Sequence, residues 1–472
     1  MENVYRKPHI KGFTPYALAA FLVGLVGGFT SLFSPAFIEE MNLPYNNTTW
    51  TALAMAMSAA AFAPVLGKLG DMIGRRITLL IGIAVFTLGN VLTAIAPSML
   101  LMLIARFIVG IGTAAIAPVV ISYIVTEFPP DKIAKGFALY MFISSISVIF
   151  GPTVGGLIIK YYGWRRMIWV CAVLSEIVFL LCLLIRDKKQ TVRKKSENFD
   201  GVGAVFVLLF FSLLLCVPSF GQNFGWQSKL FLGILMATII SGIVLCIAEK
   251  KALNPILKGS FIKRKAFVLS VLALFLTQGL MQANMTNIIV FVNYTQPQNS
   301  VISGYAISIM YIGMSLGAVI LGPLADRYEP KRVLVGSLAL TGIGSAVMLL
   351  FSADTSVLLL AASLGVLGFG LGGNGTIFMK VALSGVSAKD SGAGTGTYGL
   401  FRDLAAPFGV AVFVPLYTNN VAKLINAGAT EIIAAINSIK KLAIVELLCI
   451  VAGVIIVLLL PEIYVDKKGA KI

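Results

Sequence analysis

Fourteen long apolar runs divide the chain, and short polar or charged segments separate them. A run of about 20 apolar residues is long enough to cross the hydrocarbon core of a bilayer as an α-helix. The pattern therefore predicts an all-α membrane protein with fourteen transmembrane helices. The expected spans lie near residues 14–38, 50–68, 77–96, 99–126, 134–160, 165–186, 202–221, 229–249, 266–293, 302–325, 332–352, 356–380, 393–418 and 440–464.

The charged turn after the second run recurs after the tenth. Gly67 and Asp71 each lie 255 positions before their copies, Gly322 and Asp326. A repeat of this length in an apolar chain indicates two homologous membrane halves related by a pseudo-twofold axis. The offset leaves runs seven and eight without a counterpart, so we expect an arrangement of six, two and six helices. The expected domains are an N-terminal six-helix bundle (1–186), a basic linker with two extra helices (187–265) and a C-terminal six-helix bundle (266–472).

Composition supports a membrane protein and excludes several other classes. Hydrophobic residues make up 58% of the chain and charged residues 12%. The net charge of +17 comes from Lys and Arg concentrated in alternate loops, as the positive-inside rule predicts, so it does not indicate a nucleic-acid partner. We expect a multi-pass plasma-membrane protein with both termini cytoplasmic. The five cysteines lie inside apolar runs without metal-ligand spacing, and neither a metal nor a cofactor is expected. Residues 431–436 are expected to form a short amphipathic helix at the outer interface.

The loop over residues 67–76 carries chemistry suited to a gate. Asp71 at a helix end can accept backbone amides or pair with a cation, while Arg75 and Arg76 can reach a carboxylate such as Glu127. Such a cluster would hold one conformation and break in the other. The alternative is a plain positive-inside turn, which the downstream copy makes less favoured. The expected conformational gate comprises Gly67, Asp71, Arg75, Arg76, Glu127, Asp326 and Arg327.

This loop resembles the signature between the second and third helices of the major facilitator superfamily. The resemblance implies the major facilitator fold and a secondary transporter that works by alternating access, not an enzyme. The stretch from Arg106 to Gly112 resembles the fourth-helix motif of proton-coupled members, with Val109 in place of the usual Gln. Arg106 lies roughly 10 Å inside its span. It either serves substrate or proton binding or snorkels to the outer interface.

The stretch from Ser147 to Gly156 resembles the fifth-helix motif of antiporters. Its glycines permit close helix approach, and its proline bends the span. Taken alone, this motif favours exchange of substrate against protons. The residues expected to bend this helix are Gly151, Pro152, Gly155 and Gly156.

The most informative polar residues lie in the ninth run. Gln278, Gln282 and Met285 share one helical face, with Met281 and Asn284 close beside it. Amides mixed with pliable thioethers suit a bulky amphipathic ligand, so these five residues are expected to bind substrate. The alternative is that they form hydrogen bonds between helices.

The thirteenth run contains an adjacent Arg402 and Asp403 near the bilayer midplane. Arg402 is expected to bind a substrate carboxylate, and Asp403 to carry the coupling proton because desolvation favours its neutral form. The alternative is that both neutralise charges on neighbouring helices. Glu446 and Glu176 lie in expected scaffold helices and rank below Asp403. Lys380 is expected to be an interfacial anchor.

Several long stretches resemble one subgroup, the proton-dependent bile acid uptake permeases of gut anaerobes. These stretches are Phe275–Pro297, Ser308–Gly317, Gly370–Gly385 and Gly394–Pro415. The resemblance implies proton-coupled uptake of an amphipathic organic anion by a monomer. The alternative is a multidrug/proton antiporter, which the fourteen runs and the fifth-helix motif favour. No acidic residue lies well inside the first run, which argues against a lipophilic cation as cargo.

Overall fold

A computed structural model describes residues 10–43, 47–128, 133–184, 201–251, 261, 263–296, 301–384 and 391–461. Over these ranges the chain is helical and contains no strand. A helix occupies each of the fourteen predicted spans, and the twelfth span is divided in two. The helices are α1 (Ile10–Glu40), α2 (Thr48–Ile73), α3 (Arg75–Ile95), α4 (Met99–Glu127), α5 (Ile133–Tyr162), α6 (Trp164–Leu184), α7 (Gly201–Phe224), α8 (Lys229–Lys251), α10 (Lys265–Thr295), α11 (Val301–Arg327), α12 (Pro330–Val347), the short 3-10 helix η4 (Met348–Leu350), α13 (Val357–Gly372), α14 (Asn374–Ala382), α15 (Ser391–Asn426) and α16 (Glu431–Leu458).

The helices are those of a membrane protein. Within the described residues, thirteen spans are long and apolar enough to cross a bilayer, with α13 and α14 forming one of them. In α2 the apolar stretch is shorter, Trp50–Ala63. The prediction of an all-α membrane protein is confirmed.

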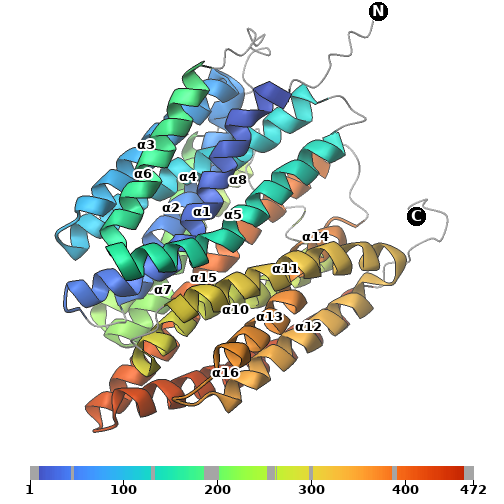
Figure 1. Cartoon of the computed structure of the whole chain (residues 1–472). Coiled ribbons are helices and arrows are strands. Elements are labelled where there is room, and N and C mark those ends of the chain that lie inside the picture. The colour runs from blue at the N-terminus through green and yellow to red at the C-terminus, as the bar shows by residue number, and fades with distance from the viewer. Residues whose placement is uncertain are drawn as a thin grey trace, which may run out of the picture.

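The helices gather into two bundles, α1–α6 and α10–α16, here called the N half and the C half (Figure 1). In Figure 1, α5 and α11 lie side by side where α5 ends and α11 begins, and they diverge towards their other ends. The turns at Gly74 and Glu329 belong to the two copies of the charged repeat, which begin at Gly67 and Gly322. Both turns lie at the end where α5 and α11 diverge. We call this the gate end, and the opposite end the far end.

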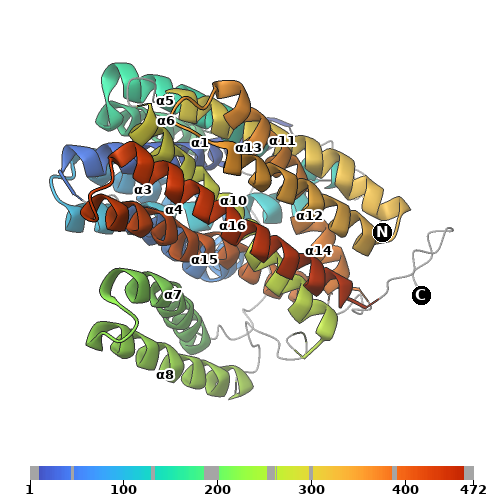
Figure 2. The same cartoon turned by 90° about the horizontal axis from the view of Figure 1, so that it is seen from below.

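The remaining two helices, α7 and α8, stand beside these bundles (Figure 2). Among the described elements, α8 packs chiefly on α7, while α7 also contacts α2 and α15. Hydrogen bonds fix α7 to α15 near the far end: Gln222 Nε2 donates to the Val412 carbonyl (2.9 Å), and Asn419 Nδ2 donates to the Gln222 carbonyl (3.1 Å).

The expected interfacial helix at residues 431–436 is wrong. Glu431 begins α16, which runs without interruption to Leu458. The Thr430 hydroxyl accepts a hydrogen bond from the Ile433 amide, and the acidic Glu431 stands in the first turn, so these polar residues start a spanning helix. The tight turn between Asn426 and Thr430, with Gly428 at φ 93°, joins α15 to α16 directly.

Glycine allows a close helix crossing in the C half between α10 and α15. Gly279 of α10 faces Gly409 of α15, and a Cβ atom on Gly409 would collide with the Gly279 backbone. The collision is with main chain, so no side-chain movement could relieve it. The crossing sets the separation of α10 and α15, the two helices that carry most of the candidate substrate residues.

We predict that Gly409→Ala destabilises the protein by ~1–3 kcal/mol, because an inserted methyl group must separate two packed backbones. Thermal unfolding of the purified protein in detergent measures the change. Gly399→Ala, on the same helix, is the matched control, since its Cβ would meet no atom within 4 Å. Equal midpoints for the two variants would contradict the proposed close crossing.

Candidate transport site and gates

Arg402 and Asp403 form an ion pair with each other. Arg402 Nε and Nη2 both lie 3.0 Å from Asp403 Oδ1. Their side chains are 49% and 43% exposed, respectively, although they stand about three turns inside α15. The pair is therefore within reach of a solute, and each charge already has a partner.

Two tyrosines interact electrostatically with Arg402 from different halves. Tyr140 belongs to α5 in the N half, and Tyr398 precedes Arg402 by one turn on α15. Tyr398 Oη donates to the Gly375 carbonyl of α14 at 3.0 Å. The ion pair thus lies where α15 faces α5 across the interface between the halves.

The candidate residues of α10 separate into two groups. Gln278 and Gln282 are partly exposed, and Gln278 Nε2 lies beside Gly375, the residue that accepts from Tyr398. Met281 and Met285 are buried in the apolar core of the C half. Asn284 is also buried and faces Glu446 of α16. In this conformation, Gln278 and Gln282 are thus the residues of the set that remain accessible.

Sequence reasoning missed Tyr140, Tyr398 and Gly375. The position of Tyr398, four residues before Arg402, was a usable signal, because residues at that spacing share a helical face. Tyr140 and Gly375 come from other helices, and no spacing within α15 points to them.

Arg106 is enclosed by the N half. It is 0% exposed, its guanidinium lies 4.6 Å from the centre of the Phe33 ring, and Nη2 is 2.8 Å from the Met55 sulfur. This placement differs from the snorkelling alternative, in which the head group would reach the interface. Arg106 interacts with aromatic and thioether groups of α1 and α2 and is covered in this conformation.

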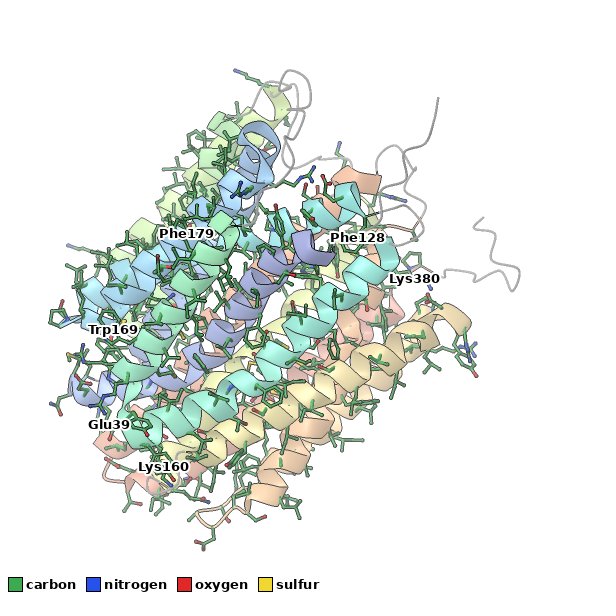
Figure 3. All side chains as sticks on the ribbon, turned by 45° about the horizontal axis from the view of Figure 1, so that its top comes forward. Glu39, Phe128, Lys160, Trp169, Phe179 and Lys380 are labelled. Atoms are coloured by element: carbon green, nitrogen blue, oxygen red, sulfur yellow. The ribbon has the colours of Figure 1, made fainter. Side chains whose placement is uncertain are left out.

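The gate end carries an ion pair in each half. Arg75 Nη1 lies 3.5 Å from Glu127 Oε1 in the N half, and Lys380 Nζ lies 2.7 Å from Asp326 Oδ1 in the C half. Lys380 also donates to the Ala325 carbonyl at 2.8 Å, so it does more than anchor a helix end. Figure 3 shows Lys380 and Phe128, the residue after Glu127, towards one end of the molecule and Glu39 and Lys160 towards the other.

The other predicted gate residues have separate places. Arg76 Nη2 donates to the carbonyls of Cys182 and Leu183 at the end of α6. Gly67 lies against Pro118 of α4, and Arg327 is exposed at the end of α11. The side chain of Asp71 lies outside the described part of the structure. The ion pairs Arg75–Glu127 and Lys380–Asp326 thus each stabilise one half internally.

Direct contacts between the halves gather towards the far end. The hydroxyls of Thr153 on α5 and Ser308 on α11 are 2.8 Å apart, and Ser308 Oγ donates to the Ile149 carbonyl at 2.7 Å. A Cβ atom on Gly304 would meet the Pro152 carbonyl, so α11 crosses α5 almost backbone to backbone.

The fifth-helix motif lies at this crossing. Gly151 and Pro152 lie against Gly28 of α1, Gly155 lies against Phe29, and Gly156 faces α11. These small residues bring α5 close to a neighbour on each side. The conformation is therefore one in which the halves meet at the far end and separate towards the gate end.

We predict that cysteines at positions 153 and 308 form a disulfide on mild oxidation, because the two native hydroxyls are in contact. The variant Thr153→Cys with Ser308→Cys is made in a chain whose five native cysteines are replaced, and loss of maleimide labelling measures the cross-link. The control pairs Thr153→Cys with Tyr305→Cys, since Tyr305 is exposed on the same helix. Equal labelling of both variants would show that the halves do not meet here.

Comparison with known proteins places these features in a family. The family model described as Major Facilitator Superfamily matches residues 16–410 and 274–470. Among curated relatives, multidrug resistance protein 3 of Bacillus subtilis (strain 168) is 24% identical over 383 residues, which are 81% of this chain and 74% of the relative. Multidrug transporter protein MdtP of the same organism is 25% identical over 404 residues, 84% of this chain and 73% of the relative.

Solved structures share the fold. The POT family transporter PepTSo has a TM-score of 0.68 at 15% identity, covering 96% of this chain and 98% of that chain. A bacterial homolog of the human lysosomal transporter Spinster, in an inward-facing and unoccupied conformation, has a TM-score of 0.66 at 11% identity, covering 96% and 97%.

Proposed function

Because the chain belongs to the Major Facilitator Superfamily, we propose that it is a multidrug/proton antiporter that exports amphipathic organic compounds. A secondary transporter of small molecules in a membrane is the family-level function. The names of its relatives from Bacillus subtilis support the multidrug assignment. The names of these relatives do not support the bile acid uptake that the resemblance to bile acid permeases implies.

The observation that carries the proposal is the exposed ion pair of Arg402 and Asp403 on α15. A proton bound to Asp403 removes one charge of the pair and leaves the Arg402 guanidinium available to another acceptor. A cationic solute instead competes with Arg402 for the Asp403 carboxylate. Proton and solute thus act on one ion pair, which is the requirement for exchanging one against the other.

The neighbourhood of the pair suits a lipophilic cargo. Phe401, next to Arg402, is partly exposed and packs edge-on against the buried Phe211 and Phe267. Phe275 and Phe408, on α10 and α15, are also partly exposed and pack against each other. Aromatic faces provide apolar contact with little directional demand, while the amides of Gln278 and Gln282 offer hydrogen bonds. Such a surface accepts solutes of varied shape, which a multidrug transporter requires.

Proton-coupled bile acid uptake is the second candidate, and the exposure of Arg402 favours it. A guanidinium binds a carboxylate through two parallel hydrogen bonds. An anion entering an inside-negative cell is opposed by about 2.3 kcal/mol per charge per 100 mV, and entry with one proton cancels that charge. In this scheme protonation of Asp403 releases Arg402 to bind the bile acid carboxylate.

Flux measurements in proteoliposomes under an imposed pH gradient separate the two candidates. If the protein is an antiporter, we expect an ethidium-like cation to move in the direction opposite to the proton flux, and cholate not to be transported. Cholate accumulation driven by acid on the outside would instead establish the second candidate. The plasma membrane and cytoplasmic termini remain part of the proposal, and accessibility labelling of engineered terminal tags in intact cells tests them.

We predict that Asp403→Asn uncouples flux from pH, because the amide cannot exchange a proton, and that Arg402→Ala lowers flux at least tenfold. Both effects are measured as initial rates across a range of pH, with protein content and monodispersity checked for each variant. Lys423→Ala, an exposed cation further along α15, is the control and should retain wild-type rates. Wild-type pH dependence in Asp403→Asn would remove its proposed proton role.

A further inference from the structure

Glu446 is a carboxylic acid sealed inside the C half. It lies near the middle of α16 and is 0% exposed. Ser345 Oγ of α12 donates to Glu446 Oε2 at 2.8 Å. The second oxygen, Oε1, is buried and makes no hydrogen bond within the described part of the chain. A carboxyl group in this position is costly in its ionised form unless a donor or a cation compensates it.

Asn284 of α10 faces the same carboxyl group. Its side chain is 0% exposed and close enough to interact with Glu446, yet neither amide atom has a partner with hydrogen-bond geometry among the described residues. An amide offers both a donor and an acceptor. It can therefore accept from a protonated carboxyl or donate to a carboxylate once it is brought into hydrogen-bond geometry.

The elements packed around Glu446 supply no cation at its level. On α16 the nearest titratable group is Cys449, one turn further on. Lys441, five residues before Glu446, is exposed and donates to Asn420 Oδ1 at 2.9 Å. The basic residues of α10 and α12, Lys265, Lys331 and Arg332, stand at the first residues of those helices. η4 contains no titratable residue.

On α15, the bond between Asn420 and Ser438 fixes the antiparallel register with α16. This register brings the apolar stretch around Val412 opposite Glu446. Arg402 and Asp403 stand about three helical turns before that stretch.

We propose that Glu446 is a second proton-binding site, and that its protonation is linked to the position of α10. In the packed arrangement described here the neutral acid is the form that fits, since the side chain is fully buried and the described residues place no cation beside it. Among the described residues, Ser345 and Asn284 are the polar groups that face a carboxylate formed by release of the proton. Because Asn284 is on α10, stabilising that carboxylate or admitting water to it requires α10 to shift against α16.

The linkage reaches the candidate transport site through the same helix. Asn284 stands less than two turns from Gln278, and Gln282 lies between them on α10. A shift of α10 at Asn284 therefore moves the two glutamines relative to Arg402. This inference rests on the proposed proton-coupled function in one respect only, namely that the proton at Glu446 takes part in coupling. The existence of the site does not depend on any cargo.

Infrared spectroscopy of the purified protein, titrated over a range of pH without substrate, tests the site directly. We expect the carbonyl stretching band of a protonated carboxylic acid in the wild-type protein, and its loss in Glu446→Gln, which keeps the volume and the bond from Ser345. Glu431→Gln is the matched control, because Glu431 is an exposed acid at the first turn of the same helix. Persistence of the band in Glu446→Gln would overturn the proposal.

Flux tests the linkage to transport. In Glu446→Gln we expect the pH dependence of the transport rate to shift relative to the wild-type protein, with Glu431→Gln unchanged. An Asn284→Leu variant, which retains Glu446 but removes its adaptable partner, should move the pH at which the infrared band appears. An unchanged pH profile in Glu446→Gln would overturn the linkage while the infrared result still decides the site. Absence of all flux in the wild-type protein would refute the proposed function alone.

Discussion

A charge placed inside a hydrocarbon layer must be compensated within the protein, because no water is available there. This chain does so in three ways. Arg106 is covered by an aromatic ring and a thioether. Arg402 is held by the adjacent Asp403 in a region that remains open. Glu446 is enclosed among hydroxyl and amide groups. A solute can touch the exposed Arg402 and Asp403, whereas only a proton can reach the buried Glu446 in this conformation.

Each half carries an ion pair at the gate end, but the two pairs use different positions of the repeat. In the N half Arg75, at the start of α3, pairs with the acid at the end of α4. In the C half Asp326, the copy of Asp71, pairs with Lys380 near the end of α14. Each ion pair stabilises its own bundle and leaves the gate end free of an ionic bond between the halves among the described contacts.

The architecture could be predicted from the sequence because it depends on the lengths of the apolar runs and on the spacing of the repeat. Run lengths near 20 residues and a repeat offset of 255 positions located a helix at every expected span. The expected helix at residues 431–436 failed for a local reason: a polar first turn with a threonine cap can equally begin a long span. The division of the twelfth span at Gly373 was also missed.

The candidate site was less predictable, because it depends on which helix lies beside each face. Residues 278, 282 and 285 share a face of an isolated helix, yet α10 has different neighbours along its length. Met285 therefore packs in the core, whereas Gln278 lies near α14. Adjacent residues on a helix point about 100° apart, which gives no indication that Arg402 and Asp403 pair with each other. The long side chain of Arg402 nevertheless reaches the Asp403 carboxylate.

The helix pair α7–α8 has a bearing on how the protein meets its lipid surroundings. Amide hydrogen bonds pin α7 to α15, whereas its contact with the N half includes the edge-on packing of Trp50 against Phe220. Ring contacts slide more readily than hydrogen bonds do. When the two halves move relative to each other, α7 and α8 are expected to move with α15 and to shift relative to α2. α7 and α8 would then cover one side of the interface between the halves while remaining attached to the C half. Lipid tails would contact these two helices before they contact the Arg402–Asp403 ion pair.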